Sequence, residues 1–263
     1  MANSAIADIP IALKPVRQSG KLSERAIQWG MFAGTVILVA GPMVPLVFQA
    51  LTDKPIYDSG HQLSLVNFYN VVSSELFREA AWNSIVFALL STLVAQIVGT
   101  LQAILISRTN MPGRAAMTPI ILLPLFLSPL VIAFGWSILY GRAGYATGLA
   151  AGLFGPQPWN LESMGGMVLV AGILQAPITF LYCRGAIALA DQSMEDAARG
   201  CGAAPLTILR RITIPLLLPS IVFSGMINLT HALETLSIPL ILGEPAEVTL
   251  LMPLLYKRAL GSA

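Results

Sequence analysis

Long apolar runs dominate the chain, and short polar segments separate them. Five windows without Asp, Glu, Lys or Arg are long enough to cross a bilayer, because a spanning helix needs about 20 apolar residues. They cover residues 26–52, 80–107, 115–141, 163–183 and 212–233. The pattern predicts a transmembrane helix in each window.

A sixth uncharged window, residues 143–161, is rich in glycine and proline. Such a window is a poor candidate for a continuous helix. We expect an interfacial or re-entrant segment with Trp159 near the lipid headgroups, where tryptophan is enriched.

Composition supports a membrane protein. Hydrophobic residues make up 56% of the 263 residues and charged residues only 11%, whereas soluble domains carry about 25% charged residues. The predicted fold class is therefore an all-α polytopic membrane protein. A net charge of +2, without a basic helix face, gives no indication of nucleic-acid binding. The two cysteines, Cys183 and Cys201, are predicted to be reduced thiols that bind no metal.

Lys and Arg residues are unequally divided between alternate connecting segments. With the N-terminus inside, the inner segments carry ten of them and the outer segments five, and an inner excess favours this orientation. The predicted organisation is a cytoplasmic tail at 1–25, an uncleaved signal anchor at 26–52 and a periplasmic segment at 53–79. A transmembrane domain follows over 80–263, with a cytoplasmic loop at 185–213.

Residues 195–215 form a polar, helix-prone island between two apolar windows. Ser193 precedes Glu195 and Asp196, so it is placed to cap a helix whose first turn carries two carboxylates. The island therefore begins with a predicted short surface helix.

The second part of the island contains two glycines and two prolines. Gly200 and Gly202 are expected to break the first helix, and Pro205 suits the first turn of a second helix. Pro215 is expected to turn the chain into the fifth span. The result is two short helices with a sharp corner between them, lying along the membrane surface.

The order Asp196-Ala197-Ala198, Gly202, Ile212, Pro215 resembles the EAA loop of binding-protein-dependent ABC importer permeases. In that family the loop docks the membrane subunit on its ATPase. The resemblance implies an ABC transporter type I transmembrane domain. It also implies an ATPase-coupling set made of Glu195, Asp196, Ala197, Ala198, Gly202, Pro205, Leu206, Leu209, Ile212 and Pro215. Asp196 stands where the family usually has Glu, and Glu195 or Asp196 can each supply the acidic group.

The likeness extends from near Asn83 to the C-terminus, and the segment LETLSIPLILGEPAEVTLLMPLLYKRAL is similar to the iron(III)-type branch. This branch commonly fuses two six-helix halves. The resemblance implies iron(III) or a related small solute as substrate. Five spans are present and the sixth is apparently missing, so we expect a fragment or the first part of a longer fused permease.

Two further groups are candidates within the predicted spans. Pro119, Pro124 and Pro129 lie five residues apart in the third window and predict a hinge on the transport path or a fixed bend. At the end of the fifth window and just after it, Asn228, His231 and Glu234 predict either path-lining residues or a structural pair, since His231 and Glu234 share a helix face.

The chain has no Walker A sequence, because Gly20-Lys21 lacks the upstream glycine and the following Ser or Thr. We therefore expect no catalytic site and no cofactor on this chain, with ATP-Mg bound by a partner. The expected partners are a cytoplasmic ABC ATPase dimer, a second permease half, a periplasmic substrate-binding protein and membrane lipid, at a bacterial inner membrane. The alternatives are a secondary transporter driven by an ion gradient and a non-transporting membrane scaffold.

Overall fold

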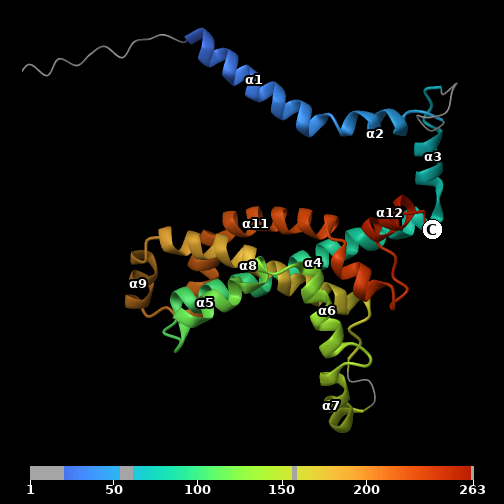
Figure 1. Ribbon diagram of the computed structural model, residues 1–263. Coiled ribbons are helices and arrows are strands. Elements are labelled where there is room, and N and C mark those ends of the chain that lie inside the picture. Colours follow the sequence, from blue (N-terminus) through green and yellow to red (C-terminus); the bar gives the residue numbers. More distant parts are fainter. Residues whose placement is uncertain (1–20, 54–61, 156–158, 262–263) are drawn as a thin grey trace, which may run out of the picture. The chain divides into compact units, whose positions relative to one another are not determined.

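The computed structural model describes residues 21–53, 62–155 and 159–261, and almost all regular structure in these ranges is helical (Figure 1). The β pairing among the described residues is an isolated bridge between Thr52 and Leu63. The chain divides into two compact units, Met1–Val72 and Ser73–Ala263.

The first unit contains α1 (Lys21–Ala40) and α2 (Met43–Ala50), followed by α3 (Val66–Ser73) at its end. A bend of 43° separates α1 from α2, at the place where Pro42 interrupts the helical hydrogen bonds. Large apolar side chains such as Trp29 and Leu38 are exposed. The two helices have the length and composition of one bent membrane span.

The second unit is built around α4 (Glu75–Arg108) and α8 (Met164–Leu189), which lie side by side (Figure 1). At 1.5 Å per residue, the 34 residues of α4 extend about 50 Å, which exceeds the ~30 Å hydrocarbon core of a bilayer. The charged residues Glu75 and Arg108 lie at its two ends. The helix is thus long enough to place its charged ends outside the hydrocarbon.

Small residues allow α4 and α8 to approach closely. The buried face of α4 consists mainly of small side chains: Ala80, Ser84, Ala88, Ser91, Ala95, Gly99 and Ala103. A Cβ atom at Gly99 would lie 2.4 Å from the Ala176 carbonyl oxygen, and one at Gly172 would lie 2.5 Å from Val94. Small residues at three- and four-residue spacing are a general means of packing helices in lipid, where no hydrophobic force drives helices together.

The third long helix begins at Pro205 and continues to Glu234 as α10 (Pro205–Ile208), the π-helix η2 (Leu209–Thr213) and α11 (Ile214–Glu234). The expectation that Pro215 turns the chain is wrong, because Pro215 lies in the first turn of α11. A proline is tolerated there because the π-helix changes the hydrogen-bond pattern immediately before it.

The third predicted window is broken rather than continuous. It forms α5 (Arg114–Leu122), the 3-10 helix η1 (Leu123–Phe126) and α6 (Pro129–Tyr140), with a bend of 107°. Ser128 is extended, because a residue before proline is driven away from the helical conformation. The bend is visible in Figure 1 between α5 and α6.

The glycine-rich window after α6 contains α7 (Tyr145–Phe154). Trp159 follows it and donates from Nε1 to the Tyr140 carbonyl oxygen and to Thr147 Oγ1, each at 3.0 Å. Pro156 and Pro158 lie outside the described residues. After α11 come the π-helix η3 (Pro239–Gly243) and α12 (Leu251–Ala259).

By length and composition, three described helices are able to cross a membrane, and the number rises to five if each bent pair forms one span. The predicted fold class, an all-α polytopic membrane protein, is confirmed.

The close packing of α4 on α8 predicts that Gly99→Ala destabilises the second unit by about 1–3 kcal/mol, because the added methyl group overlaps the Ala176 carbonyl oxygen. The control is Gly185→Ala, since a Cβ atom there meets nothing within 4 Å. Thermal unfolding of the chain in lipid nanodiscs measures the difference. Equal unfolding temperatures for the two variants would contradict this packing.

Candidate functional site

The polar island contains α9 (Ser193–Gly200), which connects the end of α8 to α10. Just before this helix, Asp191 accepts a hydrogen bond: the Ser193 backbone N–H donates to Asp191 Oδ1 at 2.9 Å. Hydrogen bonds from the Ser193 backbone and side chain lower the pKa of the exposed Asp191 carboxyl. The predicted Ser193 cap is wrong, since the helix begins at Ser193 itself and its N-cap residue, Gln192, makes no capping hydrogen bond through its side chain.

Gly202 forms the corner between α9 and α10. Its φ is +81°, a conformation that glycine adopts without steric cost. The Gly202 N–H donates to the Arg199 carbonyl at 2.9 Å, and the Ala203 N–H donates to the Ala198 carbonyl at 3.0 Å. These two bonds make a Schellman motif, which satisfies the last carbonyls of α9. The corner is thus fixed by backbone hydrogen bonds.

Glu195 links α9 to two other helices. Its side chain is only 3% exposed, and Oε1 lies 3.2 Å from Arg108 Nε at the end of α4. The Arg108 N–H is not aligned for a hydrogen bond, so this contact is an ion pair. The Thr213 hydroxyl, at the end of the π-helix, donates to the same carboxylate oxygen at 3.1 Å.

Asp196, the next residue, has the opposite environment. Its side chain is 58% exposed and pairs with Arg199 at 3.2 Å, whose guanidinium also lies 3.8 Å from Glu195 Oε2. Of the two acidic candidates, Asp196 faces outward and Glu195 is enclosed by the chain itself. Glu195 is thus an internal anchor of the loop.

The remaining members of the predicted coupling set are divided between surface and interior. Ala197, Gly202, Pro205, Leu206 and Pro215 are exposed, whereas Ala198, Leu209 and Ile212 are partly buried. A groove of about 350 Å³ lies between α9, α10 and the end of α4, and Leu206, Leu209 and Arg108 are among the residues that line it. The surface of the loop therefore combines small, apolar and charged groups.

Arg108 and Thr213 are functional candidates that the sequence patterns did not reveal. The only signal was the position of Arg108 as the first charge after a long apolar window. Sequence spacing does not show that both residues reach the same carboxylate.

Within the spans, Asn228 is fully buried. Its Nδ2 donates to Thr179 Oγ1 on α8 at 2.9 Å. In the amide orientation that satisfies both of its ends, Gln96 on α4 accepts from Thr179 Oγ1 at 3.1 Å and donates to Ser224 Oγ on α11 at 3.2 Å. The Asn228 side chain joins α11 to α8, and Gln96 extends this hydrogen-bonded group to α4, while a path-lining role for Asn228 stays a prediction.

His231 and Glu234 form the predicted pair, with Nδ1 and Oε1 3.3 Å apart and both side chains more than half exposed. Two of the three candidate hinge prolines line the same pocket as His231. Pro124, Pro129 and His231 line one pocket of about 250 Å³, whereas Pro119 lies inside α5.

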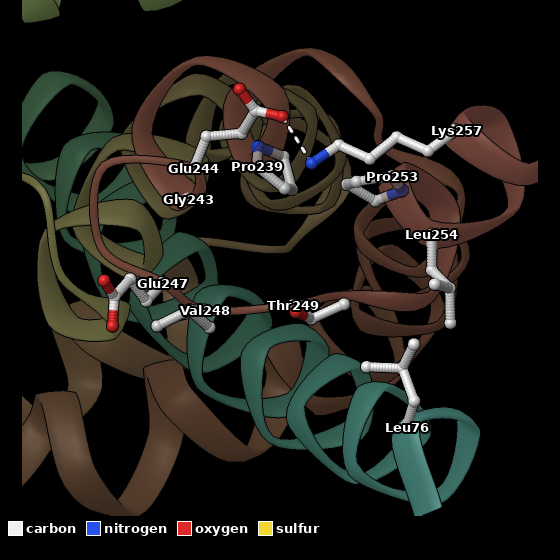
Figure 2. Close-up of a pocket in the computed structure, with 10 residues that line it drawn as sticks. All are labelled: Leu76, Pro239, Gly243, Glu244, Glu247, Val248, Thr249, Pro253, Leu254 and Lys257. Carbon is white, nitrogen blue, oxygen red and sulfur yellow. Dashed lines mark ion pairs between the residues drawn. The ribbon is translucent and has the colours of Figure 1, made fainter. Parts of the chain in front are cut away.

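A larger pocket of about 610 Å³ lies between the start of α4, η3 and α12 (Figure 2). Glu244 forms an ion pair with Lys257 across it, while Glu247 lies at its other side. The Thr249 carbonyl accepts from Asn83 Nδ2 at 3.2 Å, which ties this loop to α4.

The helical fold agrees with the comparison to known families. Residues 95–259 match the family model described as "binding-protein-dependent transport system inner membrane component", which covers more than half of the chain. The chain belongs to this family of ABC importer permeases. The predicted family is confirmed, and the permease is a multi-pass inner-membrane protein of a transport family that is not a catalytic ATPase family.

Several curated relatives are permeases. An ABC transporter permease protein of Sinorhizobium fredii is 31% identical over 65% of this chain and 30% of its own length. A protein of Salmonella typhimurium named for 2-aminoethylphosphonate transport is 25% identical over 91% of this chain and 83% of its own length. The molybdenum transport permease of Escherichia coli is 28% identical over 60% and 70%. The chain thus spans less than a third of the first of these relatives.

Among solved structures, a bacterial ABC transporter involved in alginate import is similar in fold. Its TM-score is 0.71 at 20% identity, and the match covers 90% of this chain and 85% of that chain. The same type of transporter in complex with its periplasmic protein gives 0.72. These matches support the fold of the permease.

The internal position of Glu195 predicts that Glu195→Leu lowers stability by about 3 kcal/mol, because Arg108 loses its partner in a nearly closed site. Asp196→Asn is the matched control and should cost less than about 1 kcal/mol, since its ion pair is exposed. Thermal unfolding in nanodiscs compares them. The double change Arg108→Met with Glu195→Leu should recover most of the loss, and failure of this recovery would show that the pair is not the cause.

Proposed function

We propose that the chain is a membrane-spanning permease subunit of an ATP-driven importer and that α9 with α10 couples it to a separate cytoplasmic ATPase. The observation that carries this proposal is the contact of Glu195 with Arg108 and Thr213. Through one buried carboxylate, the surface loop is connected to α4 and to the helix that continues as α11. A displacement of α9 is thereby transmitted to two spans.

The outer surface of the loop suits a protein partner. Asp196 offers a carboxylate, Ala197 permits close approach, and Leu206 is a 57% exposed apolar side chain. An exposed leucine beside small and charged groups is a reasonable contact for a docking groove on an ATPase. This assignment requires the loop and the N-terminus to be cytoplasmic.

The proposed mechanism is alternating access. Closure of an ATPase dimer on ATP-Mg moves two coupling loops, one from this chain and one from a second permease half. The spans then open towards a periplasmic substrate-binding protein and close again after hydrolysis. Such a mechanism needs a stiff element with two positions, and the hydrogen-bonded corner at Gly202 supplies stiffness.

We infer a small oxyanion as the substrate class. The relatives reported above include proteins named for 2-aminoethylphosphonate and for molybdenum transport. The first name describes a phosphonate, and dissolved molybdenum at neutral pH is chiefly a tetrahedral oxyanion. None of those reported relatives is named for iron, so the prediction of iron(III) has no support from them.

The docking proposal predicts that Gly202→Pro and Asp196→Lys each abolish association with the cognate ATPase while membrane insertion is retained. Proline is incompatible with a φ of +81° and removes the N–H that bonds Arg199. Asp196→Lys reverses the charge of the outward carboxylate. Co-purification with the ATPase measures the effect, and Gly200→Ala serves as a control because a Cβ atom there meets nothing within 4 Å.

Normal binding of the ATPase by either variant would refute the docking assignment. Reconstitution with the ATPase also separates the other functional classes. A scaffold predicts binding without stimulated ATP hydrolysis, and an ion-driven carrier predicts no binding.

A further inference from the structure

The break between α5 and α6 opens a pocket of about 250 Å³ inside the second unit. Its walls come from three elements: the break itself, the middle of α8 and the outer end of α11. The lining residues that matter below are Leu127, Pro129, Gln175, His231 and Thr235. In a membrane protein, non-helical backbone is tolerated where it is buried in protein or lines a water-filled cavity.

The start of α6 lies at this pocket. α6 has 12 residues with Pro129 at its first position, and the Ile132 N–H donates to the Ser128 carbonyl at 3.1 Å. The N–H groups of Leu130 and Val131 precede the first intrahelical bond and therefore have no acceptor within the helix. The positive end of the helix dipole and these free donors favour a negatively charged ligand.

Gln175 is an independent indication of a ligand. It lies near the middle of α8, is only 9% exposed, and its Oε1 has no hydrogen-bond partner. Among the described residues, its amide makes no hydrogen bond. A buried amide oxygen without a partner lowers the stability of the fold, and an apolar side chain would avoid that loss. Gln175 lines the same pocket as Pro129, which indicates that the amide is kept for a group that enters the pocket.

The other polar side chains of the pocket come from His231 and Thr235. His231 engages Glu234 through Nδ1 at 3.3 Å, which leaves Nε2 for another partner. Thr235 contributes a hydroxyl group. The residues that line the pocket include no Asp, Glu, Lys or Arg. Because α11 ends next to Thr235 with its negative end, a bound anion fits best on the α6 side, beside Pro129 and Gln175.

We propose that this pocket binds a small tetrahedral oxyanion, held by the Gln175 amide and the N-terminus of α6. The inference deepens the proposed function by assigning a site to the substrate class, and it rests on that function for its place on the transport path. The binding itself belongs to this chain and is measurable without an ATPase.

The test is equilibrium binding of sodium molybdate and of 2-aminoethylphosphonate to the full chain in lipid nanodiscs, measured by titration calorimetry. The wild-type chain should bind at least one probe saturably, and Gln175→Leu should weaken that binding about tenfold or more, as expected for the loss of a hydrogen bond to a charged group. Thr235→Val is a second variant with an expected smaller loss.

Gln102→Leu is the matched control. Gln102 is also an amide with a buried, unpartnered oxygen, but it lines a different pocket, between α4 and α5. This variant should bind the probes like the wild type. Thermal unfolding provides a second measurement: Gln175→Leu should leave the unfolding temperature unchanged or raise it, whereas a purely structural role for Gln175 would lower it.

Three results would overturn the inference: no saturable binding of either probe by the wild-type chain, unchanged binding by Gln175→Leu, or equal weakening by Gln102→Leu. A parallel titration with ferric citrate that shows binding of iron(III), with no binding of the two oxyanions, would also overturn it. None of these results affects association with the ATPase, which tests the proposed function separately. If the chain binds oxyanions but no ATPase, the inference about the pocket stands and the proposed importer function is refuted.

Discussion

One buried carboxylate determines how the loop that contains α9 is attached to the long helices of this permease. Glu195 lies within 3.2 Å of Arg108 on α4 and accepts a hydrogen bond from Thr213 at the end of the π-helix. A charge enclosed in this way is costly unless it is paired, so the loop has little freedom to move independently of α4 and η2. The π-helix matters for the same reason: it changes the phase of the helix just where Thr213 has to face Glu195.

The membrane imposes the second constraint. Lipid offers no hydrophobic force for helix association, so α4 and α8 pack through small residues, with Gly99 and Gly172 at the closest approaches. Buried polar side chains then hold α11 against this pair through Asn228 and Thr179. These contacts fix three helices. The α5–α6 segment bends sharply beside them, and the residues at its break line a pocket.

Much of the architecture was predictable because it follows from local rules. Apolar windows of about 20 residues indicated the spans, and the Gly202 corner followed from the tolerance of glycine for positive φ. The errors have local causes as well. Ser193 is the first residue of α9 and not its N-cap. The prolines of the third window combine with an extended Ser128 into a bend of 107°, too large for a kinked single helix.

The sequence by itself determined the class of protein, the approximate position of the apolar helices and the helical segments on either side of the Gly202 corner, since each depends on neighbouring residues. Only the tertiary structure decided which of two adjacent carboxylates is exposed and which is buried. Glu195 and Asp196 have the same chemistry, and their difference arises because Arg108, from a distant helix, lies on one side of α9. The convergence of Pro129, Gln175 and His231 on one pocket has the same origin. Long-range packing brings these residues together, and the spacing of residues along the chain does not reveal their proximity.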